Sequence, residues 1–442
     1  MKMENTFQVM KRVLIITYYW VPSGGSGVQR WVKFAKYLRQ FGWEPIIYTP
    51  LNPEFPAIDK SLEKDLPTDL QVIKMPIWEP YNIYRNLTGK KNQPINAGFI
   101  SEGKKQGWKD KLSIWIRGNF LIPDPRRFWI KPSVRYLQSY IQDNPVDAII
   151  TTGPPHSIHF IGLGLKKHFP NLPWMADFRD PWTNIYYHSD LQLTKWADAV
   201  HHRLEKQIVQ GADTVLVVST RTRDEFAKHK PKAIELITNG YDSEDAQQLD
   251  VKLDSKFSIA HIGLFIESQN PKKLWKVLSE LCTELPDFAT DLHIHLIGKI
   301  DFSIIQHIKQ AGLEANATIA PYMPHADVIK IQHASQVLLL LLVNKPNTES
   351  VIPGKLFEYF NARRPILAIG HTNGDSAALI NSTGAGAIVD FDDEKSLKSF
   401  VVEAYQQYKK GTLTCNSSNI EQYSRRNLTH KLSNILNTLS QK

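Results

Sequence analysis

The feature that most constrains the fold is a repeated alternation of short apolar runs with amphipathic stretches. Most of the runs are continuous and rich in Val, Ile and Leu, which is typical of parallel strands buried on both faces. The amphipathic stretches between them, such as 28–41 and 270–284, have helical periodicity. We expect strands at 13–20, 45–49, 71–75, 147–152, 174–177 and 214–219, then at 257–262, 292–297, 317–320, 337–343, 365–369 and 387–390. The predicted fold class is α/β, with two doubly wound Rossmann-like domains facing each other across a cleft.

The chain has 442 residues, which favours two domains because a typical domain has ~150. A polar, acidic segment at 241–255 separates the two series of strands. We therefore expect a first domain over 1–240, a second over 256–412 and a helical tail over 413–442. Leucine and isoleucine recur at three- or four-residue spacing near the end of the tail, which indicates an amphipathic helix.

Composition excludes several classes of protein. Apolar residues make up 42% and charged residues 22%, so the chain is neither disordered nor collagenous. The longest aliphatic run, 337–343, is far shorter than the ~20 residues that span a bilayer. Two cysteines, Cys282 and Cys415, and no recognisable secretion signal predict a cytoplasmic protein. The net charge of +9 is compatible with anionic partners, but no nucleic-acid-binding motif accompanies it.

A glycine-rich loop follows the first predicted strand and precedes a helix. It contains Gly24, Gly25, Ser26 and Gly27. Glycines at such a junction let the backbone approach a ligand, and the helix N-terminus offers N–H groups to a phosphate. The spacing does not match the dinucleotide or P-loop patterns. The alternative is a tight strand-to-helix turn.

A second candidate site begins a helix in the second domain. Pro353 and Gly354 suit a helix start, and Lys355 and Glu358 are three residues apart, so they share a helical face. The lysine could neutralise phosphates while the carboxylate takes ribose hydroxyls. The alternative is a surface ion pair between the two.

Charged side chains also follow a predicted strand of the first domain. Asp177, Arg179 and Asp180 lie just beyond its end, and His156 follows a neighbouring strand. Ligands of open α/β sheets bind at this edge, so these are candidate catalytic residues. A salt-bridge network centred on Arg179 is the structural alternative.

Five features in order resemble family 4 glycosyltransferases of the GT-B fold, in a branch common in bacterial surface-polysaccharide clusters. They are the glycine loop, the Asp-Phe-Arg-Asp-Pro-Trp segment at 177–182, the Thr-Asn-Gly-Tyr-Asp segment at 238–242, Gly263, and the Pro-Gly-Lys-Leu-Phe-Glu-Tyr segment at 353–359. The tail from Tyr423 also resembles that of the family, and this resemblance implies that its helix packs back on the first domain.

The resemblance implies that the second domain binds a nucleotide-diphosphate sugar. Glu358 occupies the position of the ribose-binding carboxylate, Asn239 belongs to a donor-side motif, and the glycine loop faces the diphosphate and the sugar. Related enzymes retain anomeric configuration and usually need no metal, because helix dipoles and basic side chains neutralise the leaving group. No cofactor is expected beyond the nucleotide sugar itself.

Three positions depart from the family pattern. The paired acids of the family have seven residues between them, whereas Glu349 and Glu358 have eight. The expected basic residues after Gly263 are replaced by Leu264 and Gln269. The phosphate charge would then be met by Lys355, Lys272 or Lys273.

The segment 102–135, part of an expected insertion near 80–135, is basic and aromatic. It has nine Lys or Arg against three Asp or Glu, interleaved with five Trp and Phe. This composition suits the surface of an anionic bilayer. A packed helical insertion with a solvated face is the alternative.

The leading hypothesis is a hexosyl-type glycosyltransferase that acts on a glycan or lipid-linked glycan, in the cytoplasm or peripherally on the inner face of the cell membrane. Two alternatives stay open. One is a catalytically lapsed nucleotide-sugar-binding protein, and the other is a sugar-nucleotide 2-epimerase of the same architecture. Nucleic acid is not an expected partner.

Overall fold

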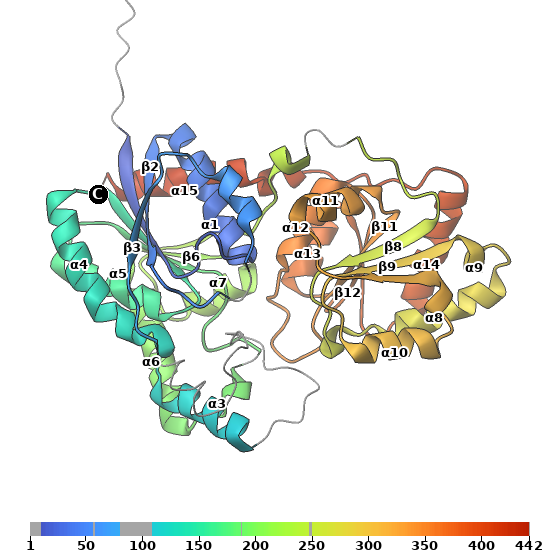
Figure 1. Cartoon of the computed structure of the whole chain (residues 1–442), viewed down its shortest axis with the longest axis horizontal. Coiled ribbons are helices and arrows are strands. Elements are labelled where there is room, and N and C mark those ends of the chain that lie inside the picture. Colours follow the sequence, from blue (N-terminus) through green and yellow to red (C-terminus); the bar gives the residue numbers. More distant parts are fainter. Residues whose placement is uncertain (1–9, 56–57, 80–107, 187, 247–249, 442) are drawn as a thin grey trace, which may run out of the picture. The chain divides into compact units, whose positions relative to one another are not determined.

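We analysed a computed structural model, which describes residues 10–55, 58–79, 108–186, 188–246 and 250–441 (Figure 1). Much of the expected insertion, 80–107, lies outside the described residues, as do Lys104 and Lys105. The chain divides into two compact units. The first contains Met1–Thr238 and Arg425–Lys442, and the second contains Asn239–Ser424.

The first unit is built on a seven-stranded parallel sheet in the order β3-β2-β1-β4-β5-β6-β7. Its strands are β1 (Lys11–Thr17), β2 (Trp43–Pro50), β3 (Gln71–Met75), β4 (Ala148–Gly153), β5 (Trp174–Phe178), β6 (Thr214–Val217) and β7 (Ile234–Leu236). Its helices are α1 (Ser26–Leu38), α3 (Trp108–Phe120), α4 (Ile130–Asp143), α5 (Ser157–His168), α6 (Lys195–Gly211), α7 (Thr220–Ala227) and α15 (Arg425–Leu439).

Both faces of this sheet are covered. On one face, the β1 residues Val13 and Ile15 pack with α1 and α15; on the other, Leu14 and Ile16 pack with α4, α5 and α6. The C-terminal helix α15 lies on α1 through Leu428, Leu432 and Leu436, which are buried. The expected return of the tail helix to the first domain is confirmed.

The second unit contains a six-stranded parallel sheet in the order β10-β9-β8-β11-β12-β13. Its strands are β8 (Phe257–Ile262), β9 (Leu292–Ile297), β10 (Ala317–Ala320), β11 (Val337–Leu341), β12 (Ile366–Ile369) and β13 (Gly386–Val389). Its helices are α8 (Lys272–Glu284), α9 (Phe288–Asp291), α10 (Phe302–Gln310), α11 (His325–Ala334), α12 (Gly354–Ala362), α13 (Asp375–Thr383) and α14 (Glu394–Lys409). Helices α8, α10 and α14 cover one face, and α12 and α13 pack on the other.

The sheet order places the predicted motifs at the points where each sheet changes direction. The strand order reverses between β1 and β4 in the first unit, and between β8 and β11 in the second. The glycine loop follows β1 and His156 follows β4, while Gly263 follows β8 and α12 follows β11. Switch points of this kind are where doubly wound sheets bind ligands.

The predicted fold class is confirmed: two doubly wound parallel α/β units with a returning C-terminal helix. One strand, β7, was not predicted. It has only three residues, all half-buried, so it lacks the long apolar run that marks the other strands.

Candidate functional site

The polar residues of the second unit gather at the carboxyl end of β8, where α12 begins. Helix α12 begins at Gly354, with Pro353 at its N-cap and no capping side chain. Lys355 therefore lies in the first turn, beside N–H groups that carry partial positive charge.

Lys355 points at the turn after β8. Its Nζ lies 3.5 Å from Nε2 of His261, and a Cβ placed on Gly263 would lie 3.1 Å from the same Nζ. Gly263 has φ of +117°, a conformation that disfavours other residues. The lysine thus occupies the space that a side chain at 263 would need, and this position requires glycine.

Burial lowers the pKa of Lys355 from 10.5 to about 8, although the Glu358 carboxylate acts in the opposite direction. Its neighbour His261 is fully buried, and Nδ1 donates to the Leu339 carbonyl at 3.1 Å, which leaves Nε2 as an acceptor. Burial, and next the charge of Lys355, hold the pKa of His261 well below 6.5. A cation faces a neutral histidine, and no carboxylate of the described residues lies at hydrogen-bond distance from it.

Glu358 lies one turn further along the same helix. Its Oε1 is 3.3 Å from Nε2 of His325, and its Oε2 accepts a hydrogen bond from Gln332 at 2.9 Å. Burial raises the pKa of Glu358, but the contacts with His325 and Gln332 and the charge of Lys355 outweigh it, so the net shift is downward. The surface ion pair between Lys355 and Glu358 is wrong: each of the two has its own polar partners.

The departures from the family pattern have structural roles. Gln269 donates to the Leu341 carbonyl at 3.1 Å and accepts from the Ile266 amide at 3.2 Å, so it ties the turn before α8 to β11. Leu264 is 37% exposed. Lys272 is exposed at the start of α8, whereas Lys273 pairs with Glu394.

Two further predicted residues lie elsewhere in the second unit. Glu349 is half-buried, and its carbonyl accepts from the Asp375 amide at 2.8 Å. Asn239 is half-buried at the beginning of this unit.

In the first unit, Asp177 is enclosed rather than open. It is fully buried and accepts hydrogen bonds from Arg30 at 3.0 Å, Trp31 at 2.8 Å and Thr152 at 2.8 Å. Arg30 is buried as well, and it also donates to the carbonyls of Ile237 and Thr238. The carboxylate therefore joins β5 to β4 and α1, and Arg30 extends the cluster to the segment that follows β7.

Arg179 does not form the salt-bridge network that was the structural alternative to a catalytic role. Its guanidinium donates to the carbonyls of Gly153 and Pro154 and lies against Gly27, where a Cβ would overlap it. The ion pair to Asp177 comes instead from Arg30. The adjacent Asp180 is half-buried, and burial raises the pKa of its carboxyl group.

His156 lies flat against an aromatic surface. Its ring stacks on Trp182 at 4.7 Å between centroids, with an angle of 6° between the planes. Burial lowers the pKa of His156 well below 6.5, and its buried Nδ1 has no hydrogen-bond partner among the described residues. The ring is therefore neutral at pH 7.

The glycine loop forms a turn into α1. Gly25 is the N-cap, with φ of +109°, and its carbonyl accepts from the amides of Val28 and Gln29. No side chain caps this helix, and no acidic residue lies in its first turn. Gly24 is buried, whereas Gly25 and Ser26 are exposed.

Helix α3 carries an apolar stripe on its exposed side. Trp108, Leu112, Ile116 and Phe120 recur at every fourth residue, and their exposed fractions range from 43% to 70%. Lys111 is exposed beside them. Within the described residues, no helix is both long and apolar enough to cross a membrane.

The sequence profile of Glycosyltransferase Family 4 matches residues 100–245. Residues 100–245 are therefore similar to this family, and they make up about a third of the chain. The matched segment lies within the first unit except for its last residues, and it includes His156, Arg179 and Asp180. No protein in a comparison with curated sequences matches the chain.

Solved structures show the same fold at low sequence identity. Sucrose-phosphate synthase from Thermosynechococcus elongatus has 13% identity and a TM-score of 0.61, over 97% of this chain and 99% of that one. WaaG, a glycosyltransferase involved in lipopolysaccharide biosynthesis, has 13% identity and a TM-score of 0.56, over 96% and 99%. A protein assigned as a UDP-N-acetylglucosamine 2-epimerase, from Listeria monocytogenes, has 10% identity and a TM-score of 0.56, over 98% of each chain. The fold is thus GT-B, which transferases and epimerases share.

Three of the site residues could not be found by local motif analysis. His325 and Gln332 lie on α11, about 30 residues before Glu358, and nothing in their surroundings marks them. His261 had a weak signal, since it interrupts an apolar strand two residues before Gly263.

Proposed function

We propose that the protein is a retaining, metal-independent glycosyltransferase that moves a hexosyl group from a nucleoside-diphosphate sugar to a glycan or lipid-linked glycan, in the synthesis of a cell-surface polysaccharide. The observation that carries the proposal is the position of Lys355 against Gly263, with Glu358 one turn further on the same helix. The family 4 match in the first unit supports the same activity.

In this proposal, the diphosphate binds at the start of α12, between Lys355 and the turn at Gly263. Free N–H groups and a lysine ammonium stabilise the negative charge that grows on the leaving oxygen, and this takes the place of a metal. Pro353 and Gly354 begin α12 and leave room for the diphosphate to reach its N–H groups. Lys272, at the start of α8, adds a second positive charge. Gly24, Gly25, Ser26 and Gly27 stay predicted donor-binding residues on their own evidence, which is the uncapped start of α1.

Glu358 accepts the ribose hydroxyls through the lone pairs that Gln332 and His325 leave free. A carboxylate already held by two side chains loses little freedom on binding, which favours this role. We also assign Asn239 and Glu349 to the donor site. Asn239 lies at the beginning of the second unit, and the carbonyl of Glu349 accepts a hydrogen bond from the Asp375 amide.

The first unit supplies the groups for the acceptor. His156, whose ring is neutral, can exchange a proton with a hydroxyl, while Arg179 and Asp180 orient the sugar. Both oxygens of Asp177 already accept hydrogen bonds within the fold, so Asp177 acts as a positioning residue. It holds Arg30, which in turn binds the backbone carbonyls of Ile237 and Thr238.

A screen of nucleotide sugars by thermal shift tests the donor site, because a ligand that binds only the native state raises the melting temperature. Donor consumption with and without an acceptor extract then tests transfer. A donor that binds and is transferred supports the proposal. An isomerised donor without any acceptor would identify an epimerase instead.

A catalytically lapsed donor-binding protein is the second candidate. The specific observation in its favour is that Leu264 and Gln269 offer no cation to the diphosphate, and that Gln269 is bound within the fold. This candidate predicts donor binding with no consumption under any condition.

We also propose that α3 docks on the inner, anionic face of the cell membrane, where a lipid-linked acceptor resides. An apolar stripe flanked by basic residues inserts at the interface of such a bilayer. Trp108→Ser together with Phe120→Ser should release the protein from phosphatidylglycerol vesicles, whereas Phe302→Ser, an equally exposed change in the second unit, should not. Wild-type protein that never sediments with these vesicles would contradict the docking.

A further inference from the structure

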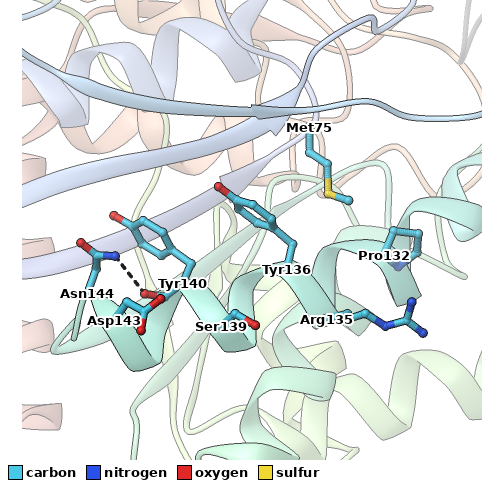
Figure 2. Close-up of a pocket in the computed structure, with 8 residues that line it drawn as sticks. All are labelled: Met75, Pro132, Arg135, Tyr136, Ser139, Tyr140, Asp143 and Asn144. Atoms are coloured by element: carbon cyan, nitrogen blue, oxygen red, sulfur yellow. Dashed lines mark hydrogen bonds between the residues drawn. The ribbon is translucent and has the colours of Figure 1, made fainter.

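An open pocket lies beside α4, at the edge of the first sheet formed by β3. One face of α4 lines it with Pro132, Arg135, Tyr136, Ser139, Tyr140 and Asp143, and Met75 and Asn144 complete it (Figure 2). Its volume is about 470 Å³, within the range of small-ligand sites. None of these eight residues belongs to the site described above.

A stack of aromatic rings forms one wall of the pocket. Trp129 stacks on Tyr48 at 5.0 Å, Tyr48 on Tyr136 at 6.1 Å, and Tyr136 on Tyr140 at 6.5 Å, with angles of 16°, 24° and 14° between planes. Trp129 and Tyr48 are buried, whereas Tyr136 is 43% exposed. The buried rings hold Tyr136 in a fixed orientation, so a ligand that stacks on it pays little ordering entropy.

Polar groups surround these rings. Arg135, Ser139 and Asp143 are exposed, and no hydrogen bond or ion pair joins their side chains to another described residue. The Asn144 amide nitrogen donates to the Tyr140 carbonyl at 3.3 Å, which leaves its oxygen as an acceptor (Figure 2). The Tyr140 hydroxyl is buried without a partner among the described residues.

This combination fits a sugar better than a phosphate or a nucleotide. The two charged residues, Arg135 and Asp143, cancel, so the pocket has no positive excess for an anion. A pyranose has an apolar C–H face that packs on an aromatic ring, and hydroxyls that both donate and accept hydrogen bonds. Guanidinium, carboxylate and amide groups at the rim match such hydroxyls.

We infer that this pocket binds one pyranose unit of a glycan, stacked on Tyr136 and hydrogen-bonded to Arg135, Asp143 and Asn144. This inference rests on the proposed function, in which the glycan is the chain that the enzyme extends. The pocket binds it through residues other than those proposed for the transfer step. Such a subsite would retain long acceptors between successive transfers.

The test is direct binding of soluble glycans. A glycan array that includes maltotetraose, cellotetraose and tri-N-acetylchitotriose selects the probe, and calorimetry on the full chain measures its affinity. We expect Tyr136→Ala to weaken binding roughly tenfold or more, and Tyr136→Phe, which keeps the ring, to change it by less than about threefold. Trp196→Ala, a change of an exposed aromatic residue outside the pocket, should leave affinity unchanged.

Two results would overturn the inference: no glycan on the array binds wild-type protein, or the selected glycan binds Tyr136→Ala as tightly as wild type. A peptide that binds at Tyr136 while no glycan does would show that the β3 edge recruits a protein segment instead. Binding is measured without a nucleotide and in Lys355→Ala, so it stands apart from transfer. Wild-type protein that binds the glycan but transfers no sugar from any donor would reject the proposed function but not the subsite.

Discussion

The two units place polar groups at the same edge of similar sheets but use them differently. In the first unit, both oxygens of Asp177 accept hydrogen bonds from Arg30, Trp31 or Thr152, and the whole cluster is buried. In the second unit, Nζ of Lys355 lies 3.5 Å from a neutral histidine, and no carboxylate among the described residues pairs with it. The charge of Asp177 is neutralised by an ion pair with Arg30, whereas the charge of Lys355 is not neutralised by an ion pair with any described residue.

This difference distinguishes a charged residue that stabilises the fold, such as Asp177, from one that is available to a ligand, such as Lys355. A satisfied buried pair resists change in any direction, because removal of either partner leaves the other charge uncompensated. A cation whose pKa burial has lowered gains most when an anion arrives. The sequence motifs alone look equivalent, since both put charged residues just beyond a buried strand.

The largest expected effect is on stability, from Asp177→Ala. Loss of the carboxylate leaves Arg30 buried without its charge partner, which should lower the free energy of unfolding by about 3–5 kcal/mol. Urea denaturation followed by fluorescence measures the loss. Asp180→Ala, three residues further on, is the matched control and should cost less than about 1 kcal/mol. Equal stability of the Asp177 variant and wild type would make this cluster dispensable.

Lys355→Ala should reduce turnover by ~100-fold, comparable to the removal of one oxyanion donor, with the fold intact by circular dichroism. The reason is that the ammonium acts on charge that develops only in the transition state, so donor affinity should fall less than turnover. Lys276→Ala, on an exposed part of α8, should transfer sugar normally. A wild-type rate in the Lys355 variant would reject the leaving-group role.

Gly25→Val should also lower turnover by ~100-fold. A Cβ at this position would meet no atom within 4 Å, so the cause is the φ of +109°, which valine disfavours and which shapes the turn into α1. Gly42 has φ of +82° and equally open surroundings, and it lies away from the glycine loop. Gly42→Val should cost similar stability and leave turnover unchanged; an equal loss of turnover in both would make the effect one of folding.

Glu358→Ala should weaken donor binding by about 1.5–3 kcal/mol, the range for hydrogen bonds to a charged group. Calorimetry with the donor found in the screen measures the change, and Glu394→Ala on α14 provides the control. Unchanged affinity would assign Glu358 to the support of α11 through His325 and Gln332.

The smallest effect is a pH dependence of donor affinity. Lys355 carries its charge below its pKa of about 8 and loses it above, so affinity should be constant below pH 8 and fall roughly tenfold by pH 9. In the absence of donor, the free energy of unfolding changes with pH in the opposite direction. The lysine of the unfolded chain titrates near 10.5, so the unfolded state binds more protons than the folded state between pH 8 and 10.5. The free energy of unfolding therefore rises with pH over this range. Lys355→Arg stays charged and should remove both dependences. An unaltered pH profile in this variant would assign the titration to another group.

The strands of this protein were largely predictable. The predicted ranges 71–75, 257–262, 292–297 and 317–320 coincide with β3, β8, β9 and β10. Strand β8 is buried along its whole length, as expected of a continuous apolar run in a parallel sheet, whereas β3 and β10 are edge strands with exposed residues. The need for glycine at Gly25 and Gly263 was also readable, since Gly25 lies in the glycine-rich loop between β1 and α1 and Gly263 directly follows β8, and both have positive φ. Local periodicity and backbone preference act between near neighbours, and the sequence displays them directly.

Only the tertiary structure decided which charges meet. Arg30 reaches Asp177 across 147 residues, and Gln332 reaches Glu358 from another helix, so the local rule that pairs Lys355 with Glu358 was wrong. The sequence by itself determined two doubly wound sheets and the helix start that carries Lys355 and Glu358. Packing determined that Asp177 pairs with Arg30 and that Lys355 lies against neutral His261. The partners of a buried charge come from chain segments that meet only in the folded protein.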